Sequence, residues 1–439
     1  MGMENTRAVH LLYGKTGMTL KVPARAVILT GQQVPPVVDV DRAVAEALAA
    51  PIGSPPLPEL IAAKKPATVA ITISDMTRPV PNKQFLPAML KMLNDCGVAD
   101  DQIVIIVGTG MHRVSTPEEL DVILGAEILA RVEVLDHTAD RPETLTKVSD
   151  DPSVSVCTRF VEADFRIVTG YIEPHFMAGF SGGRKGVCPA LVDLKTVQRF
   201  HGYDTLADPM ADNGVLTGNP CHEIAMKVAQ IVGVDFLFNV AITQDRRIAG
   251  IYCGDLVEAH LAGCEQVAEW TTARIDAPFD LVITCGGGYP LDQTFYQTVK
   301  GMCTALPAIG PDTTLLQVSN CSEQIGSGAY TKLMMNWDGN WRGFLEHIQA
   351  NRHQTELDQW ELQMQCRVLE RIGAKKLWFA SDGIEMDVQR RLNLTPLAGD
   401  GDAALRAQWA IDEYMAAHPG AVVAVIPEGP YTMLKATGS

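Results

Sequence analysis

Short apolar runs of β-branched residues, separated by amphipathic segments, constrain the fold of this chain most strongly. Residues 67–74 (ATVAITIS) and 102–107 (QIVIIV) are two such runs, and residues 83–96 between them have the apolar spacing of a helix. A strand, a helix and a second strand in this order form a βαβ unit with parallel strands. The pattern therefore predicts a parallel sheet covered by helices.

The same alternation continues along the chain. Thr116-Pro117-Glu118-Glu119 supplies an N-cap, a first-turn proline and a capping glutamate, so a helix is expected to begin there. Residues 9–33 predict a hairpin around Tyr13-Gly14-Lys15-Thr16-Gly17, ahead of a helix at 41–50. Further strands are predicted at 132–135, 165–169, 281–284, 314–318, 377–380 and 421–426. The predicted fold class is α/β, with mostly parallel sheets covered by helices.

At about 150 residues per domain, the 439 residues suggest two or three domains. Asp276-Ala277-Pro278 separates a helical stretch, 256–273, from a new strand. We expect an N-terminal α/β domain over residues 1–277 and a C-terminal α/β domain over residues 278–439, with the active site in the cleft between them. The last ~20 residues are expected to pack back on the N-terminal domain.

Charge and cysteine content exclude several classes of function. The chain has 36 Lys and Arg against 52 Asp and Glu, a net charge of −16, and so acidic a surface repels nucleic acid. Its ten cysteines are scattered without a C-x-x-C pair, as in a reduced cytoplasmic protein. No apolar stretch approaches the ~18 residues of a membrane span. We expect a cytoplasmic enzyme with no nucleic-acid or membrane partner.

Ligands of open parallel sheets bind beyond the carboxyl ends of the strands, so the residues after each apolar run are the first candidates. Ser74-Asp75-Met76-Thr77-Arg78-Pro79 follows the first run; its backbone N–H groups and Thr77 can hold a phosphate, and Arg78 can clamp a carboxylate. Gly108-Thr109-Gly110-Met111-His112-Arg113 follows the second run and offers His112 for acid–base chemistry. Taken singly, each segment is also consistent with an ordinary turn.

A long glycine-rich loop, residues 170–186, follows the strand at 165–169. It contains His175 and Lys185, and such a loop is costly to order unless something binds it. It is neither a P-loop nor a dinucleotide fingerprint, because the G-x-x-x-x-G-K-S/T and G-x-G-x-x-G patterns are absent. An ordinary surface loop is the alternative interpretation.

The second half of the chain offers a further candidate segment. Cys285-Gly286-Gly287-Gly288-Tyr289-Pro290 follows a strand and precedes Gln297 and Lys300. These two residues are three apart on one helix face, so both can reach an anion in the cleft. Glu323 with Gly326-Ser327-Gly328 is expected only to shape that cleft.

The ordered combination of these motifs resembles the nickel-dependent lactate racemase family. The motifs are Ser-Asp-x-Thr-Arg-Pro, Gly-Thr-Gly-x-His-Arg, Pro-His-x-x-Ala-Gly-Phe-Ser-Gly-Gly-Arg-Lys, a His sixteen residues after that Lys, and Asp-x-x-x-Tyr-Gln-x-x-Lys. The resemblance implies two α/β domains and a nickel-pincer nucleotide, Ni(II)-pyridinium-3,5-bisthiocarboxylic acid mononucleotide, which holds nickel through sulfur, carbon and sulfur. It also implies cofactor-biosynthesis proteins as partners.

By motif position, the resemblance implies roles for individual residues. Lys185 would form the covalent thioamide tether, His201 would be the nickel ligand, and His112 and His175 would be paired acid/bases. The implied cofactor-binding residues are Asp75, Met76, Thr77, Arg78 and Lys185, and the implied substrate-binding residues are Arg78, Gln297 and Lys300. Three pincer donors and one neutral imidazole make a square-planar field that suits Ni(II).

The predicted function is racemisation or epimerisation of a small 2-hydroxy acid, lactate or another short-chain member, by transient hydride transfer to the tethered cofactor. Phe176 and Met177 beside His175 predict an apolar wall and a short, uncharged substrate side chain. Two alternatives remain open. The first is a metal-dependent hydrolase, although the sequence lacks the H-x-H or H-x-x-x-H spacing of its metal ligands. The second is a non-catalytic binding protein for a phosphorylated metabolite, which would give the two histidines no role.

Overall fold

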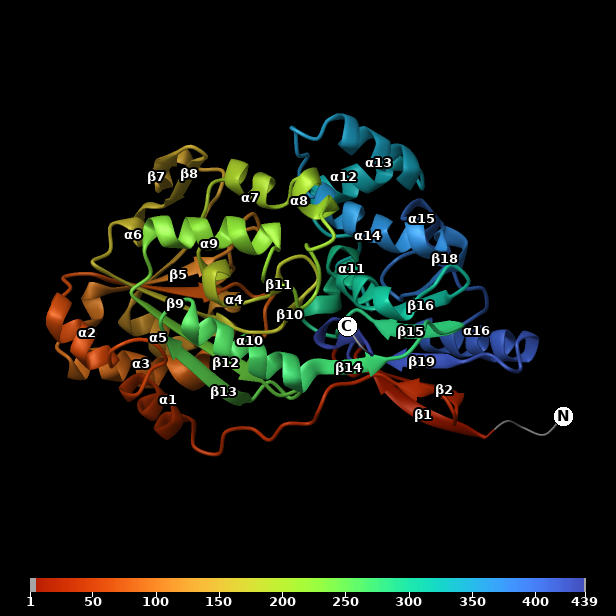
Figure 1. Cartoon of the computed structure of the whole chain (residues 1–439), viewed down its shortest axis with the longest axis horizontal. Coiled ribbons are helices and arrows are strands. Elements are labelled where there is room, and N and C mark those ends of the chain that lie inside the picture. Colours follow the sequence, from red (N-terminus) through yellow and green to blue (C-terminus); the bar gives the residue numbers. More distant parts are fainter. Residues whose placement is uncertain (1–4, 438–439) are drawn as a thin grey trace.

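Two six-stranded sheets form the centre of the computed structural model, which describes residues 5–437 (Figure 1). The first sheet has the order β13-β12-β9-β4-β5-β6. Its strands are β4 (Val69–Ser74), β5 (Ile103–Gly108), β6 (Glu133–Asp136), β9 (Phe165–Tyr171), β12 (Phe236–Ile242) and β13 (Ile248–Gly254). Neighbouring strands pair in parallel except at the β12–β13 edge.

The second sheet is parallel throughout and has the order β18-β17-β16-β15-β19-β3. Its strands are β3 (Val27–Ile28), β15 (Leu281–Cys285), β16 (Thr314–Val318), β17 (Leu377–Ala380), β18 (Thr395–Pro396) and β19 (Val423–Ile426). The predicted α/β class with mostly parallel sheets is confirmed.

Helices cover both sheets. In the first half they are α1 (Val40–Ala49), α2 (Leu57–Lys64), α3 (Asn82–Asp95), α4 (Pro117–Leu124), α5 (Ala126–Arg131), α6 (Thr158–Val161), α7 (Leu194–Phe200), α8 (Tyr203–Ala207), α9 (Pro220–Val232) and α10 (Glu258–Thr271). In the second half they are α11 (Phe295–Thr304), α12 (Gly328–Trp337), α13 (Trp341–Ala350), α14 (Gln359–Ile372), α15 (Met386–Arg391) and α16 (Ala403–Ala417). Within residues 5–437, none of the helices has the length and apolar character that crossing a membrane requires.

Alternate residues of β4 show why this strand is apolar throughout. Ile71 and Ile73 belong to one apolar cluster, which also contains Leu86 of α3, whereas Ala70 belongs to a different cluster. Side chains of a strand alternate between the two faces of its sheet, so both faces are buried.

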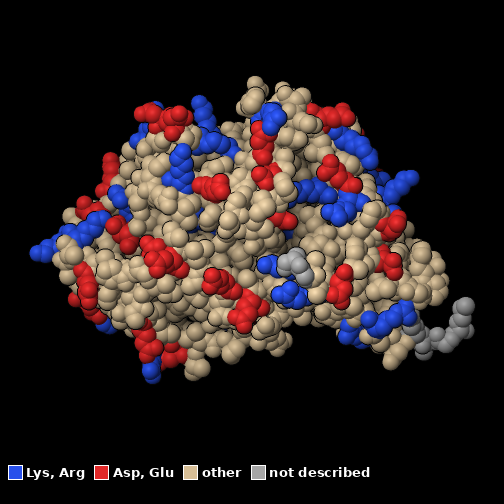
Figure 2. Space-filling view, viewed as in Figure 1, with Lys and Arg blue, Asp and Glu red and all other residues tan. Residues whose placement is uncertain are grey.

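On the molecular surface shown in Figure 2, acidic and basic side chains are interspersed.

The ends of the chain cross between the two halves. The predicted hairpin forms as β1 (Thr6–Leu11) and β2 (Met18–Pro23), and it packs with β3 and α16 against the second sheet (Figure 1). Conversely, β20 (Met433–Ala436) pairs with β14 (Thr272–Ile275). This differs from the expectation that residues 1–277 form a single unit, because the apolar face of the hairpin is covered by the second sheet. The small pairs β7 (Leu145–Asp150) with β8 (Ser153–Cys157), and β10 (Pro174–His175) with β11 (Gly179–Phe180), complete the strands.

Strand order in the first sheet determines where a ligand can bind. From β4 the chain proceeds outward through β5 and β6 on one side, and then through β9, β12 and β13 on the other. The order therefore reverses between β4 and β9, and the loops after these two strands diverge at that point. Open α/β sheets bind ligands in the crevice that such a reversal creates.

Gly301 provides a test of how closely α11 packs on the second sheet. A Cβ atom at this position would lie 2.1 Å from the carbonyl oxygen of Cys285. We expect Gly301→Ala to lower the free energy of unfolding by about 1–3 kcal/mol, as overpacking does, although alanine favours helices. Urea unfolding measures the change. Gly420→Ala is the control, since nothing lies within 4 Å of its Cβ, and equal stability of both variants would contradict the close packing.

Candidate active site

A cavity of about 660 Å³ lies between the loops after β4, β5 and β9 on one side and α11 and α14 on the other. Every predicted site residue except Met76 lines it, namely Asp75, Thr77, Arg78, His112, His175, Lys185, His201, Gln297 and Lys300. Met76 instead packs against the apolar cluster beneath α3, so its side chain is not brought to the site. Glu323, Gly326, Ser327 and Gly328 also line the cavity, as expected of residues that shape it.

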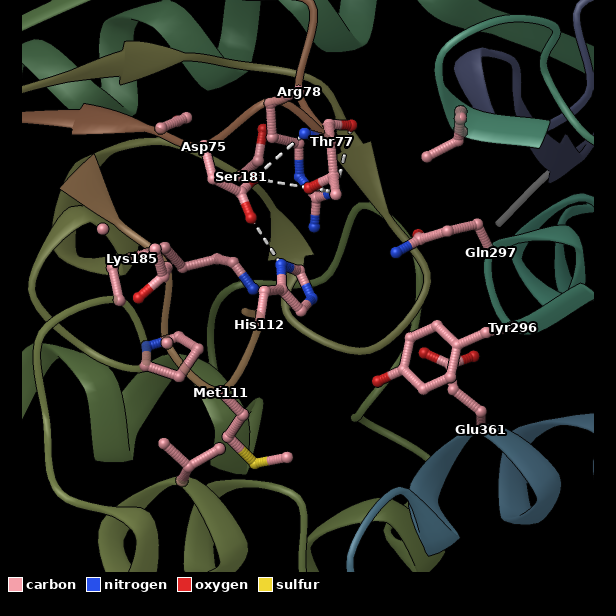
Figure 3. A pocket seen from close by; sticks show the side chains of 18 of the residues that line it. Asp75, Thr77, Arg78, Met111, His112, Ser181, Lys185, Tyr296, Gln297 and Glu361 are labelled. Atoms are coloured by element: carbon pink, nitrogen blue, oxygen red, sulfur yellow. Dashed lines mark hydrogen bonds and ion pairs between the residues drawn. The ribbon is translucent and has the colours of Figure 1, made fainter. Parts of the chain in front are cut away.

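Asp75 orients His112. Its Oδ2 lies 2.5 Å from His112 Nδ1, while its Oδ1 accepts a hydrogen bond from the Thr77 hydroxyl at 2.5 Å (Figure 3). Burial alone raises the pKa of Asp75, but His112, Arg78 and Thr77 together bring it down to about 2. Asp75 is therefore ionised and accepts a hydrogen bond from the Nδ1–H group of His112, which leaves Nε2 of His112 as the free nitrogen. Sequence reasoning had assigned Asp75 only to the cofactor.

His175 has the opposite arrangement. Its Nδ1 accepts hydrogen bonds from the backbone N–H groups of Met177 and Ala178, each at 3.3 Å, so the neutral ring carries its proton on Nε2. That nitrogen lies 3.3 Å from Lys185 Nζ. Burial, followed by the nearby cations Lys185 and Lys300, lowers the pKa of His175 well below its usual range. The ring is accordingly neutral at physiological pH.

Lys185 lies in a short turn, Gly183–Gly186, whose geometry depends on glycine. Gly183 has φ +53°, and a Cβ there would lie 2.5 Å from the His260 ring. Next to it, the fully buried Arg184 donates to the carbonyl oxygen of Ala178 at 2.6 Å. Burial, with the charges of Arg184 and Arg78, lowers the pKa of Lys185 to about 7. A substantial fraction of this lysine is therefore a neutral, nucleophilic amine near neutral pH.

His201 follows α7 and presents one ring nitrogen as a potential ligand. Its Nδ1 donates to the carbonyl oxygen of Val197 at 2.9 Å, and its ring stacks on Trp360 with centroids 4.6 Å apart. Burial, together with Lys185, lowers the pKa of His201 to about 3, so the ring is neutral. A neutral imidazole whose Nδ1–H is held by a carbonyl group is the usual form of a metal-ligating histidine.

The second half of the chain supplies the opposite wall. Gln297 and Lys300 of α11 are each 7% exposed, and Gln297 faces Arg78 across the cavity (Figure 3). Burial, followed by the charge of Arg78, lowers the pKa of Lys300. Together, Arg78, Gln297 and Lys300 form a site that suits a carboxylate, because they combine two cationic groups with an amide donor.

Three residues of this wall lie outside the predicted set. Trp360 stacks on His201 and donates to the Tyr296 hydroxyl at 2.6 Å, and Glu361 lies beside Tyr296 (Figure 3). Tyr296 belongs to a motif that sequence reasoning singled out, but without a role of its own. Trp360 and Glu361 lie on α14. The sequence gives only a weak indication that this helix contributes to a site: polar residues alternate with apolar ones, and the structure buries nearly all sides of the helix.

The donor set fits a metal that arrives with its own ligands. Within the described chain, residues 5–437, no group of three or more His, Cys, Asp or Glu side chains is arranged to hold a metal ion. A nickel ion at His201 would therefore take its other ligands from the cofactor, as a sulfur–carbon–sulfur pincer allows. The partly neutral Lys185 fits a covalent tether in the same cavity.

Comparison with known proteins identifies the family. The lactate racemase N-terminal domain matches residues 13–214, and the lactate racemase C-terminal domain matches residues 275–433. The chain belongs to the lactate racemase family. This membership makes it an isomerase of the racemase type, and it favours that activity over a metal-dependent hydrolase or a non-catalytic binding protein.

Individual members support this assignment along most of the chain. The lactate racemase of Lactiplantibacillus plantarum is 34% identical over 383 residues, which cover 86% of this chain and 87% of that protein. The lactate racemase of Thermoanaerobacterium thermosaccharolyticum is 30% identical over 389 residues, which cover 88% of each.

Solved structures share the fold. The lactate racemase apoprotein from Thermoanaerobacterium thermosaccharolyticum superposes with a TM-score of 0.86 at 28% identity, covering 98% of this chain and 100% of that chain. A protein from Thermotoga maritima, 16% identical, superposes with a TM-score of 0.67 over 92% of this chain and 99% of its own. The second likeness concerns the fold alone.

The contrasting hydrogen bonds of His112 and His175 predict contrasting ring protons. In ¹⁵N-histidine NMR spectra near neutral pH, we expect a proton on Nδ1 of His112 and, for the neutral His175, on Nε2 alone. Acidification should leave His175 neutral well below the usual value of 6.5, because protonation adds a charge to a buried, cationic environment. His112→Gln and His175→Gln assign the signals.

Asp75→Asn should shift the His112 proton, since an amide can donate to Nδ1 where a carboxylate only accepts. Asp140→Asn, at an exposed position, is the matched control. A proton on Nδ1 of neutral His175, or protonation of that ring near pH 6.5, would contradict the assignment.

Proposed function

We propose that this chain racemises a small 2-hydroxy acid, lactate or another short-chain member, using a nickel-pincer nucleotide tethered at Lys185. The observation that carries the proposal is the meeting, in one cavity, of two differently oriented histidines, a partly neutral lysine, and a carboxylate site from the other half of the chain. The lactate racemases that resemble this chain support lactate as the first substrate to test.

In this proposal, Arg78, Gln297 and Lys300 bind the substrate carboxylate and thereby fix the position of the neighbouring Cα atom. Asp75 and Thr77 hold the segment that carries Arg78, because Thr77 Oγ1 accepts from Arg78 Nη1 at 3.1 Å and itself donates to Asp75. Together with the backbone at Met76, this segment would also hold the phosphate of the cofactor. His201 would be the nickel ligand from the protein.

The two histidines are proposed to act as base and acid toward the substrate oxygen. His112, whose Nδ1 proton is directed at Asp75, offers a free Nε2 and takes the proton from the substrate hydroxyl. His175 serves the opposite enantiomer: in its doubly protonated, imidazolium form it gives a proton to the oxygen of the transient 2-keto acid and is left as the neutral ring, and proton exchange with solvent restores both rings. Reversing the direction of racemisation exchanges the two roles.

When bound, the cofactor would supply an electrophile that accepts a hydride from Cα and returns it. The Cα–H beside a carboxylate is a weak acid, so removal as hydride avoids a difficult proton abstraction. A thioamide at Lys185 carries no positive charge, and its formation would remove one cause of the lowered pKa of His175. Attachment would therefore make His175 a better proton carrier.

The proposal extends to the surroundings of the enzyme. The two α/β halves, divided near Pro278, are proposed to act as domains whose approach excludes water from the cavity. Cofactor-biosynthesis proteins would be needed as partners, and the cytoplasm is the proposed location because the ten cysteines are unpaired, as in a reducing compartment.

Intact-mass spectrometry of protein from a cofactor-producing host tests the tether. For the wild type, we expect a mass above that of the bare chain by the mass of the cofactor. Lys185→Ala should lose this added mass together with racemase activity. His201→Ala should keep the added mass but bind less nickel. Lys195→Ala, at an exposed position of α7, should behave as the wild type does. A wild-type mass equal to that of the bare chain would overturn the cofactor proposal.

Racemisation of Cα-deuterated substrate in ordinary water tests the chemistry. We expect deuterium to be retained in the opposite enantiomer, and complete exchange with solvent would replace hydride return with proton abstraction. His112→Gln and His175→Gln should each lower kcat by at least ~10²-fold in both directions, as loss of a general acid–base does. His353→Gln, an exposed substitution, should leave the rate unchanged.

A further inference from the structure

Glu361 is a buried carboxyl group in the cavity to which the proposed reaction gives no role. It is 3% exposed, belongs to α14, and lines the cavity beside Tyr296 and Gln297. Figure 3 shows these three side chains on one wall, across the cavity from Arg78 and Lys185. Because α14 packs directly on α11, this carboxyl group is held by two helices rather than by a loop.

The hydrogen-bonding capacity of this wall is not used by the protein. Oε2 of Glu361 and Oε1 of Gln297 are both buried and have no hydrogen-bond partner among the described residues. Buried acceptors without donors are costly, and a carboxylate is the costliest of them. A ligand that brings hydroxyl groups would satisfy both atoms.

Electrostatics favour a ligand of this kind over a second anion. Burial raises the pKa of Glu361, and the neighbouring ammonium group of Lys300 opposes this rise by favouring the carboxylate. Lys300 is also a proposed partner of the substrate carboxylate. A substrate anchored there would place the rest of its chain near Glu361, whose unpartnered oxygen can accept from an O–H group, whereas a second carboxylate brings no donor to it.

We propose that Glu361 determines specificity by accepting a hydrogen bond from a hydroxyl group in the substrate side chain, so that the preferred substrate is a 2-hydroxy acid with at least one further hydroxyl. This inference rests on the proposed function and narrows its substrate class. It revises the expectation that an apolar wall at Phe176 and Met177 selects a short, uncharged side chain: both residues line the cavity, but so does the polar Glu361.

Matched substrate pairs test the inference with the cofactor-loaded enzyme. Glycerate and 2-hydroxybutyrate are similar in shape, as are 2,4-dihydroxybutanoate and 2-hydroxypentanoate, and each pair differs by a hydroxyl in place of a methyl group. We expect kcat/KM to favour the hydroxylated member of at least one pair by ~10-fold or more, because sites built for a hydroxyl reject analogues that lack it. Malate, with a second carboxylate, should be a poor substrate.

Variants at Glu361 separate specificity from folding. Glu361→Met keeps the length of the side chain but removes the acceptor, and it should bring the ratio within each pair to about one or invert it, mainly through KM for the hydroxylated acid. Glu361→Gln keeps an acceptor without the charge and should retain part of the preference while admitting malate better. Glu370→Gln, an exposed change on the same helix, should leave every ratio unchanged.

The outcomes distinguish this inference from the proposed function. Racemisation of 2-hydroxybutyrate and 2-hydroxypentanoate as fast as, or faster than, their hydroxylated partners would overturn the role of Glu361 while leaving the racemase intact. Ratios that Glu361→Met does not change would overturn it as well. Failure of every acid in the panel, with an enzyme whose mass includes the cofactor, would overturn the proposed function itself.

Discussion

Buried positive charge is the constraint on which the cavity depends. Arg78, Lys185 and Lys300 line the cavity, Arg184 is buried next to Lys185 in the chain, and each affects the ionisation of its neighbours. Burial alone would make four cations costly, so the cavity stabilises them with Asp75, Glu173 and Glu361 and with the carbonyl groups that Arg184 reaches. The remaining positive potential suits the anions that the proposed function requires, a substrate carboxylate and a cofactor phosphate.

The same charges explain why the histidines differ in behaviour. His175 is buried among cations and resists protonation, whereas His112 is more exposed and has an ionised carboxylate at Nδ1. Two equivalent bases, one on each side of the substrate Cα atom, would be the simplest arrangement for a racemase. The structure instead holds the two rings through different partners, a carboxylate for His112 and backbone N–H groups for His175, so the two rings can act on the substrate oxygen from different positions.

Much of the fold could be predicted from the sequence because its signals are local. The run at 67–74 becomes β4, the run at 102–107 becomes β5, and the Thr116 capping box begins α4 as expected. Strand β12 and the edge strand β13 were not predicted, and neither was the position of the hairpin on the second sheet. Such pairings depend on which distant surface covers an apolar face, and residue spacing along the chain does not contain that information.

The site shows the same division between local and distant information. Motif residues that directly follow strands, such as His112 and Lys185, could be identified because strand ends in a parallel sheet converge. Glu361 and Trp360 reach the cavity from the middle of a buried helix, and only the packing of α14 on α11 places them there.

This division has a physical consequence for how the enzyme is built. The loops proposed to transform the common part of a 2-hydroxy acid come from the first sheet, where the reversal between β4 and β9 fixes their positions, and α11 adds Gln297 and Lys300 to the carboxylate site. The wall proposed to read the variable part of the substrate comes from helices of the second half. Substitutions on α14 can therefore change which acid is accepted without disturbing the hydrogen bonds that orient His112 and His175, because none of those bonds involves α14.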